Sequence, residues 1–148
     1  MSTKTSVLKD LIQTLEDGRL GFEKGAEKLT ADGDQSGAQT FRNLSEQRAR
    51  FSAELRDLAR AGGDDLDQGG SIAGSLHRGW LTLKDAISGD NPSGVLDAAE
   101  QGEDHAKSEY QKALADDGLA GDARTVVERQ YQAVAAAHDQ VRAMRDAA

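Results

Sequence analysis

Histidines and carboxylates at helical spacing are the residues of this sequence that could bind a metal. A di-iron centre inside a helical bundle needs a carboxylate from each of two helices and a Glu-x-x-His pair from each of the other two, because these spacings place the ligands on one inward face. No Glu-x-x-His pair occurs in the sequence. The nearest substitutes begin at Glu46, Glu54 and Glu128 and have Ala, Asp and Tyr where the imidazole is needed. A complete di-iron ligand set is therefore not expected.

A smaller, carboxylate-rich metal site is the alternative. Glu54, Glu103 and His138 fall in three different predicted helices and together offer two carboxylates and one imidazole. Such ligands suit iron, manganese, zinc or copper. This alternative would make the protein a metal-binding protein or an oxidoreductase with a divalent metal, whereas the preferred interpretation needs no cofactor.

The preferred interpretation is a structural one, because Arg48, Glu103 and His138 continue the apolar stripes of their segments at heptad spacing. Charged residues at such positions are rarely buried unless they are paired. We therefore predict an internal ion pair between Arg48 and Glu103, with His138 or Tyr110 hydrogen-bonded nearby. Small rotations of the helices would instead let these side chains reach the surface.

A third group, His77 and Arg78 beside Trp80, could bind an anion or a π-system. A single tryptophan on a short amphipathic helix is more often a core anchor, which is the interpretation we favour. A small-ligand carrier with its pocket between this helix and the main bundle stays open. Cysteine nucleophiles are excluded because the sequence has none, and no glycine-rich loop follows a strand to hold phosphate.

Five segments have apolar residues at helical spacing, and none shows the two-residue alternation expected of strands. They cover residues 7–29, 38–58, 72–87, 95–114 and 127–144. Four long helices of about 25 residues would each span about 37 Å at roughly 1.5 Å per residue. These lengths predict an all-α four-helix bundle, with an additional short helix in the connection between the second and third long helices.

Breaker and capping residues set the boundaries of these helices. Asp- and Gly-rich turns at 32–34 and 116–118 are short, so each should join two antiparallel neighbours. The Gly- and Asp-rich residues 62–70 end the second helix, after which Ser71 can cap the short helix and Pro92 can begin the next long one. About 30 residues separate the second and third long helices, enough for a crossover along the bundle.

The composition limits partners and location. The formal net charge is −8, and acidic residues occur in every predicted helix, which disfavours binding to nucleic acid or to an anionic membrane. The first residues pass directly into an amphipathic pattern without a signal-peptide core, and no apolar run approaches the roughly 20 residues of a membrane span. We expect a cytoplasmic protein whose partners are proteins or further copies of itself, such as a homodimer.

Several short motifs along the whole chain resemble an uncharacterised, mostly proteobacterial family of ferritin-like four-helix-bundle proteins, classed as a domain of unknown function. The most specific of them is the LHRGW sequence at residues 76–80. The others are Asp17-Gly18 with Phe22, Arg48 with Phe51 and Glu54-Leu55, Gly102-Glu103-Asp104, and His138-Asp139.

The resemblance implies a single ferritin-like domain over residues 1–148 and no established activity. Because a bundle is predicted and a di-iron ligand set is missing, our first hypothesis is a non-catalytic structural or protein-interaction protein. A stress-related assembly is one setting in which such a protein could act. We expect no enzymatic activity from it.

Overall fold

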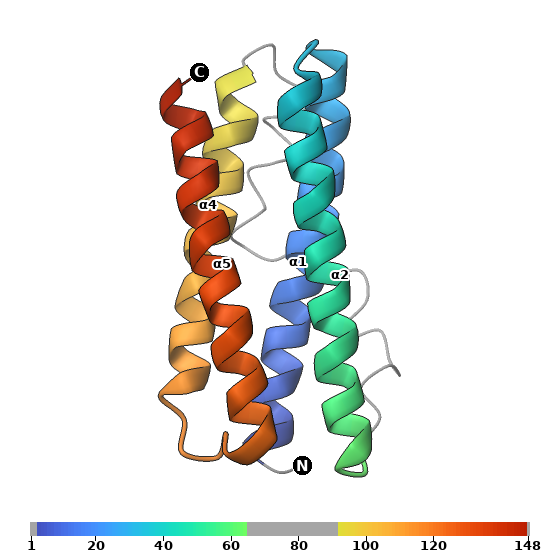
Figure 1. Ribbon diagram of the computed structural model, residues 1–148, viewed down its shortest axis with the longest axis vertical. Helices are drawn as coiled ribbons and strands as arrows, with labels where there is room; N and C mark the ends of the chain where they lie inside the picture. Colours follow the sequence, from blue (N-terminus) through green and yellow to red (C-terminus); the bar gives the residue numbers. More distant parts are fainter. Residues whose placement is uncertain (1–2, 65–91, 148) are drawn as a thin grey trace.

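The computed structural model describes residues 3–64 and 92–147, and within these ranges it consists of four α-helices and no strands. They are α1 (Thr3–Ala31), α2 (Gln35–Ala61), α4 (Pro92–Leu114) and α5 (Gly121–Ala147), and they lie side by side as a bundle (Figure 1). The prediction of an all-α bundle is confirmed. The predicted short helix at residues 72–87, which carries His77, Arg78 and Trp80, lies outside the described residues.

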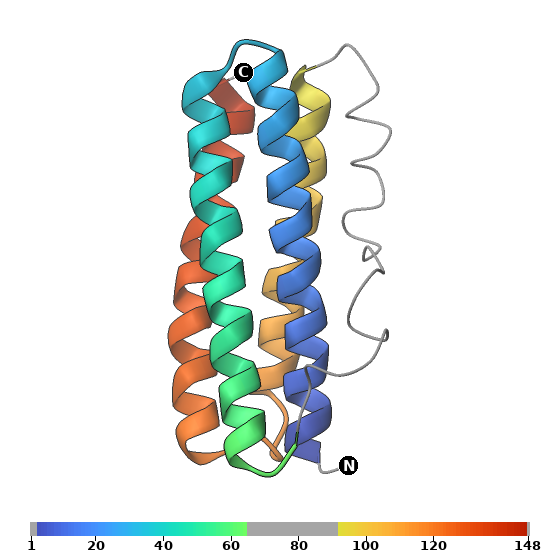
Figure 2. The same cartoon turned by 90° about the vertical axis from the view of Figure 1, so that its right-hand side faces the viewer.

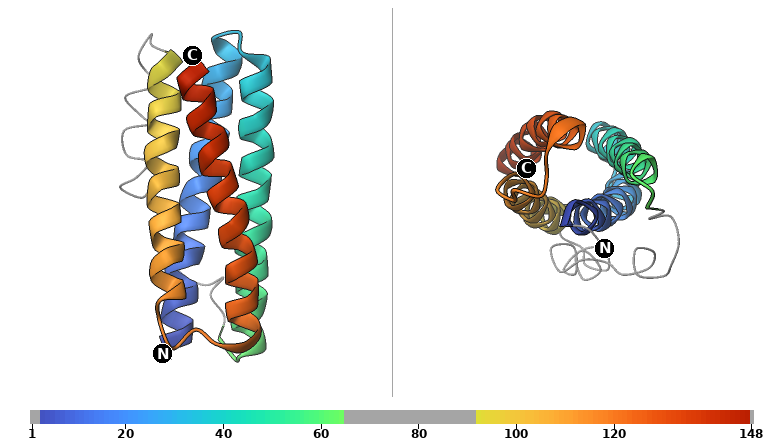
Figure 3. Two further views of the ribbon diagram at one scale, coloured as in Figure 1. Left: turned by 60° about the vertical axis from the view of Figure 1, so that its left-hand side comes forward. Right: turned by 90° about the horizontal axis from the view of Figure 1, so that it is seen from below.

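The helices form two antiparallel pairs, α1 with α2 and α4 with α5 (Figure 2). α2 ends at the end of the bundle where α1 begins, whereas α4 begins at the opposite end, so α2 and α4 run in the same direction. Seen along the bundle axis, α1 lies between α2 and α4, and α5 completes the ring (Figure 3). α2 and α4 therefore face each other diagonally across the core.

The turn between α1 and α2 shows how the local sequence sets a helix boundary. Gly33 adopts a φ of +88°, a left-handed conformation that costs glycine little and ends α1. Asp34 then caps α2, since its Oδ1 accepts a hydrogen bond of 2.8 Å from the backbone N–H of Gly37. The predicted breaker at residues 32–34 is thus a tight connection between two antiparallel helices.

Two apolar clusters fill the core, one toward each end of the bundle. The cluster near the start of α1 includes Leu8, Leu11, Leu15, Phe51, Leu55, Ala106, Tyr110, Val127 and Val134. The cluster near the end of α1 includes Phe22, Leu29, Phe41, Leu44, Val95, Ala99, Ala137 and Val141. Along α2, Arg48 falls between Leu44 of one cluster and Phe51 of the other, so a charged residue separates the two apolar halves.

Candidate functional site

A buried ion pair occupies the middle of the bundle. Arg48 on α2 donates from Nη1 to Oε1 of Glu103 at 2.6 Å and from Nη2 to Oε2 at 2.7 Å. The two side chains are 1% and 0% exposed, so the pair is shielded from water. Two parallel charge-assisted bonds of this kind are the strongest way for arginine to bind a carboxylate. The pair joins α2 to α4 across the diagonal of the core.

The surroundings of Arg48 explain how a large cation fits inside the bundle. Its Cζ lies 5.4 Å from the centre of the Phe22 ring, within the range of a cation–π contact. Its Nε donates to Oε1 of Gln47 at 3.2 Å. Gly18 of α1 lies against the arginine, and a Cβ built on Gly18 would lie 3.6 Å from Cγ and Nη1 of Arg48. The glycine thus brings α1 into close contact with the guanidinium.

Both carboxylate oxygens of Glu103 accept hydrogen bonds from Arg48, and this pairing bears on whether Glu103 could be a ligand of a di-iron centre. A metal at the same place would have to displace the Arg48 guanidinium, which already supplies the positive charge opposite the carboxylate. Together with the missing Glu-x-x-His pairs, this arrangement does not fit a di-iron centre. The described residues therefore carry a buried ion pair in the middle of the bundle core.

The other residues of the predicted metal set have separate partners. Glu54 accepts a hydrogen bond of 2.8 Å from Nε2 of Gln130 and forms an ion pair with Arg129. His138 contacts Asp104 and Asp139. The structure thus places Glu54, Glu103 and His138 in three different polar groups, while the binding of a metal to them stays a prediction.

A second buried polar group lies within the apolar cluster near the start of α1. The Tyr110 hydroxyl donates to Oε1 of Gln130 at 2.7 Å, and Nε2 of Gln130 donates to the backbone carbonyl of Phe51 at 3.3 Å as well as to Glu54. Burial raises the pKa of Tyr110 far above its usual value, because the phenolate would lose its hydration. We predicted Tyr110 as one of two candidates for a hydrogen bond near Arg48 and Glu103. Its hydroxyl instead remains neutral and donates to Gln130.

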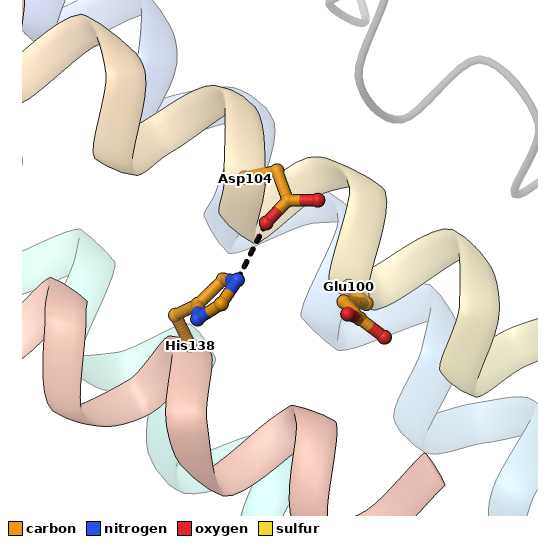
Figure 4. Close-up of side chains that lie close together, drawn as sticks. All are labelled: Glu100, Asp104 and His138. Carbon is orange, nitrogen blue, oxygen red and sulfur yellow. Dashed lines mark hydrogen bonds and ion pairs between the residues drawn. The ribbon is translucent and has the colours of Figure 1, made fainter. Parts of the chain in front are cut away.

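A third polar group lies at the seam between α4 and α5 and consists of Glu100, Asp104 and His138 (Figure 4). We call it the seam cluster. Glu100 and Asp104 are four residues apart on α4 and therefore share one face of the helix. One ligand atom from each of the three residues lies within 4.8 Å of the others. The His138 side chain is 4% exposed and that of Asp104 is 59% exposed, so the cluster reaches from the core to the surface.

Both nitrogens of the His138 ring face a carboxylate. Nε2 lies 2.5 Å from Oδ1 of Asp104, and Nδ1 lies 3.3 Å from Oδ1 of Asp139. Glu100 is engaged from the other side, since Arg142 Nε donates to its Oε1 at 3.3 Å and Arg145 forms an ion pair with its Oε2. The seam cluster and its neighbours Asp139, Arg142 and Arg145 therefore bring three carboxylates and three nitrogen groups to one helix–helix contact.

The sequence pattern indicated His138 as a candidate ligand but did not indicate Glu100 and Asp104 as its neighbours. Di-iron proteins have a Glu-x-x-His spacing, whereas these two carboxylates are related by a Glu-x-x-x-Asp spacing on α4. Glu103 and Asp104 are adjacent in sequence but point about 100° apart around the helix, because an α-helix has 3.6 residues per turn. The four-residue spacing of Glu100 and Asp104 is the feature of the sequence that indicates a shared helix face.

Within the described residues, no helix combines the length and the apolar character that a membrane crossing requires. The pocket expected beside Trp80 concerns residues that the structure does not describe.

A family model described as a domain of unknown function (DUF2383) matches residues 3–116. This range contains Arg48, Glu100, Glu103 and Asp104, and it ends before His138. No curated protein matches the chain.

Proposed function

We propose that this chain, which belongs to the family of the domain of unknown function DUF2383, is a non-catalytic helical bundle that acts through contacts with other proteins or with its own copies. One observation carries the proposal. The central position that a bundle metalloenzyme gives to its ligands is filled by the Arg48–Glu103 ion pair.

The charges in the core support this proposal. Glu103 is the most deeply buried acid of the described residues, and its charge is balanced by a single guanidinium that accounts for both oxygens. A di-iron centre has an excess of carboxylates that only metal ions can neutralise. The core of this bundle is already neutral at its middle, and both members of the pair have hydrogen-bond partners, so it needs no cation to be stable.

The chain direction supports a ferritin-like arrangement as part of the proposal. Ferritin-like bundles have one long crossover connection, and it joins two helices that run in the same direction. α2 and α4 run in the same direction here and face each other diagonally. We therefore propose a cytoplasmic, ferritin-like bundle in which arginine has replaced the metal, although this fold type does not by itself imply a function.

Aerobic oxidation of added Fe²⁺ by the untagged protein tests the non-catalytic part of the proposal. We expect the rate to equal that of buffer. The Glu103→Gln variant is compared with Glu109→Gln, a matched change at a half-buried residue of α4 that contacts His105 and Lys112 instead of Arg48. Protein-dependent oxidation that Glu103→Gln abolishes and Glu109→Gln preserves would overturn the proposal.

Sedimentation velocity over a hundredfold range of concentration tests the interaction part, together with affinity purification from an extract of the native cell. We expect either reversible self-association or a stoichiometric complex with one protein. A monomer at every concentration that also recovers no partner would contradict this part of the proposal while leaving the absence of oxidation intact.

The alternative metal centre at Glu54, Glu103 and His138 has its own test. Each of these residues would have to leave its present partners before the three could share one ion. Elemental analysis of protein expressed with added iron, manganese, zinc and copper compares the wild type with Glu103→Ala. Stoichiometric metal that disappears in the variant would support the alternative, whereas trace metal in both proteins would reject it.

A further inference from the structure

We infer that the seam cluster is a binding site for one divalent transition-metal cation, which would link α4 to α5. Its ligands would be a carboxylate oxygen of Glu100, a carboxylate oxygen of Asp104 and Nε2 of His138. The inference rests on residues other than Arg48 and Glu103, so it stands or falls independently of the proposed function.

The contact between His138 and Asp104 is the first observation behind the inference. Nε2 of His138 and Oδ1 of Asp104 lie 2.5 Å apart, within hydrogen-bond distance, so the ring nitrogen is directed at this carboxylate. A neutral imidazole has one N–H, yet both of its nitrogens face carboxylates. A proton at Nε2 accounts for this short contact, and a metal ion that takes its place would release the proton to solvent and hold Nε2 and Oδ1 farther apart.

The position of Asp139 is the second observation. Histidines that bind metals usually donate their other ring N–H to a carboxylate, which fixes the tautomer and the orientation of the ring. Nδ1 of His138 lies 3.3 Å from Oδ1 of Asp139. With Nδ1 protonated and directed at Asp139, the lone pair of Nε2 points to Asp104 and is available to a cation.

The spacing of the three ligand atoms fits one small cation after a modest adjustment. Zinc binds nitrogen and oxygen at roughly 2.0–2.2 Å, so its tetrahedral ligand atoms lie roughly 3.3–3.6 Å apart. The ligand atoms of the seam cluster lie within 4.8 Å of one another. Asp104 is 59% exposed and free to rotate, so its oxygen can move away from Nε2 while that of Glu100 moves closer. Three protein ligands would leave one position for water.

The nature of the ligands selects the class of metal. Imidazole nitrogen favours zinc and neighbouring transition metals, whereas the carboxylates keep the site hard enough for manganese. The site has no thiolate, because the protein contains no cysteine. Zn²⁺ is the most suitable probe, since it accepts a mixed set of one nitrogen and two oxygens with an open fourth position.

The two arginines at Glu100 act as competitors for the cation. Arg142 and Arg145 neutralise Glu100 in the metal-free protein, and a metal ion must displace at least one of them from the oxygen it binds. Both side chains are on the surface and more than one third exposed, so they can move outward into solvent. Removing one competitor should therefore strengthen metal binding, which a merely structural salt-bridge cluster would not do.

The test is a calorimetric titration of untagged, metal-free protein with Zn²⁺, using Asp104→Asn as the main variant. Asp104 is largely exposed, so the substitution keeps the fold while it removes a ligand charge. We expect one Zn²⁺ per chain in the wild type and an affinity lower by about tenfold or more in Asp104→Asn. The matched control is Asp57→Asn on α2, an exposed aspartate far from the seam cluster, which should bind like the wild type.

Two further variants make the result decisive. Arg145→Gln should bind Zn²⁺ at least roughly fivefold more tightly, because two unit charges about 4 Å apart in water already give this factor and Zn²⁺ carries two charges. His138→Gln should lose the site, and circular dichroism shows whether this buried substitution retains the helices. The inference is overturned if wild-type protein binds no stoichiometric Zn²⁺, or if Asp104→Asn binds as tightly as Asp57→Asn.

Discussion

The buried Arg48–Glu103 pair and the seam cluster use similar residues within one turn of α4, yet their environments differ completely. Glu103 is enclosed, and each of its oxygens binds one nitrogen of a single arginine. Asp104, the next residue, is mostly exposed and shares His138 with Asp139. An enclosed and completely paired group suits a structural role, whereas the partly exposed seam cluster is where we propose that a cation binds.

Breaking the buried Arg48–Glu103 pair should have the largest effect on stability. Glu103→Ala leaves the guanidinium of Arg48 buried without its carboxylate, so we expect a loss of about 3–5 kcal/mol in the free energy of unfolding. Urea denaturation followed by circular dichroism measures it. A loss below about 1 kcal/mol would mean that Arg48 reaches water or another partner.

The double variant Arg48→Met with Glu103→Leu is the control for that measurement. Replacement of both charges by apolar groups of similar volume is often neutral or stabilising. We expect the double variant to regain most of the stability that Glu103→Ala loses. Failure to regain it would show that the pair contributes more than the avoidance of an unpaired charge.

Removal of the buried but neutral Tyr110–Gln130 hydrogen bond should have an intermediate effect on the free energy of unfolding. Tyr110→Phe removes the donor to Oε1 of Gln130, and we expect a loss of about 1–3 kcal/mol because a buried acceptor remains without its partner.

The pH dependence of this variant has a definite sign. The pKa of Tyr110 is raised in the folded protein because burial disfavours the phenolate, so the folded state keeps a proton that the unfolded state releases near its ordinary pKa of 10.0. This stabilisation is fully present below pH 10 and is lost as the pH rises further, by about 1.4 kcal/mol per pH unit. Denaturation between pH 9 and 11 should show a fall in stability that approaches this slope toward pH 11 in the wild type, and a shallower fall in Tyr110→Phe. Equal slopes would contradict burial of the neutral phenol.

A substitution in the exposed part of the seam cluster should have the smallest effect on stability. Asp104→Asn weakens a largely exposed ion pair, so the free energy of unfolding should fall by less than about 1 kcal/mol. The same denaturation experiment measures it, at low and at high salt. A loss as large as that of Glu103→Ala would assign the seam cluster to the structural core and would remove the contrast between the two groups.

The helices and the Arg48–Glu103 pair could both be predicted from the sequence, because both follow from the heptad spacing of apolar residues. Arg48 and Glu103 continue apolar stripes whose neighbours are buried, so their burial and pairing follow from the periodicity. The grouping of His138 with Glu103 and Glu54 required the relative rotation and axial shift of three helices, which a single sequence does not contain. The pairing of Asp104 and Glu100 with His138 does not follow from the sequence, because two acids at i, i+4 are common in helices and their spacing does not show that Glu100 is buried.

The parallel, diagonal placement of α2 and α4 has a consequence for how the two helix pairs assemble. Arg48 belongs to the α1–α2 pair and Glu103 to the α4–α5 pair, so their charges meet when the pairs dock at one alignment. Sliding one pair by a single helical turn, about 5.4 Å, would separate the two charges and place each against apolar side chains. A misdocked assembly would therefore contain two unpaired buried charges and should be less stable than the native alignment.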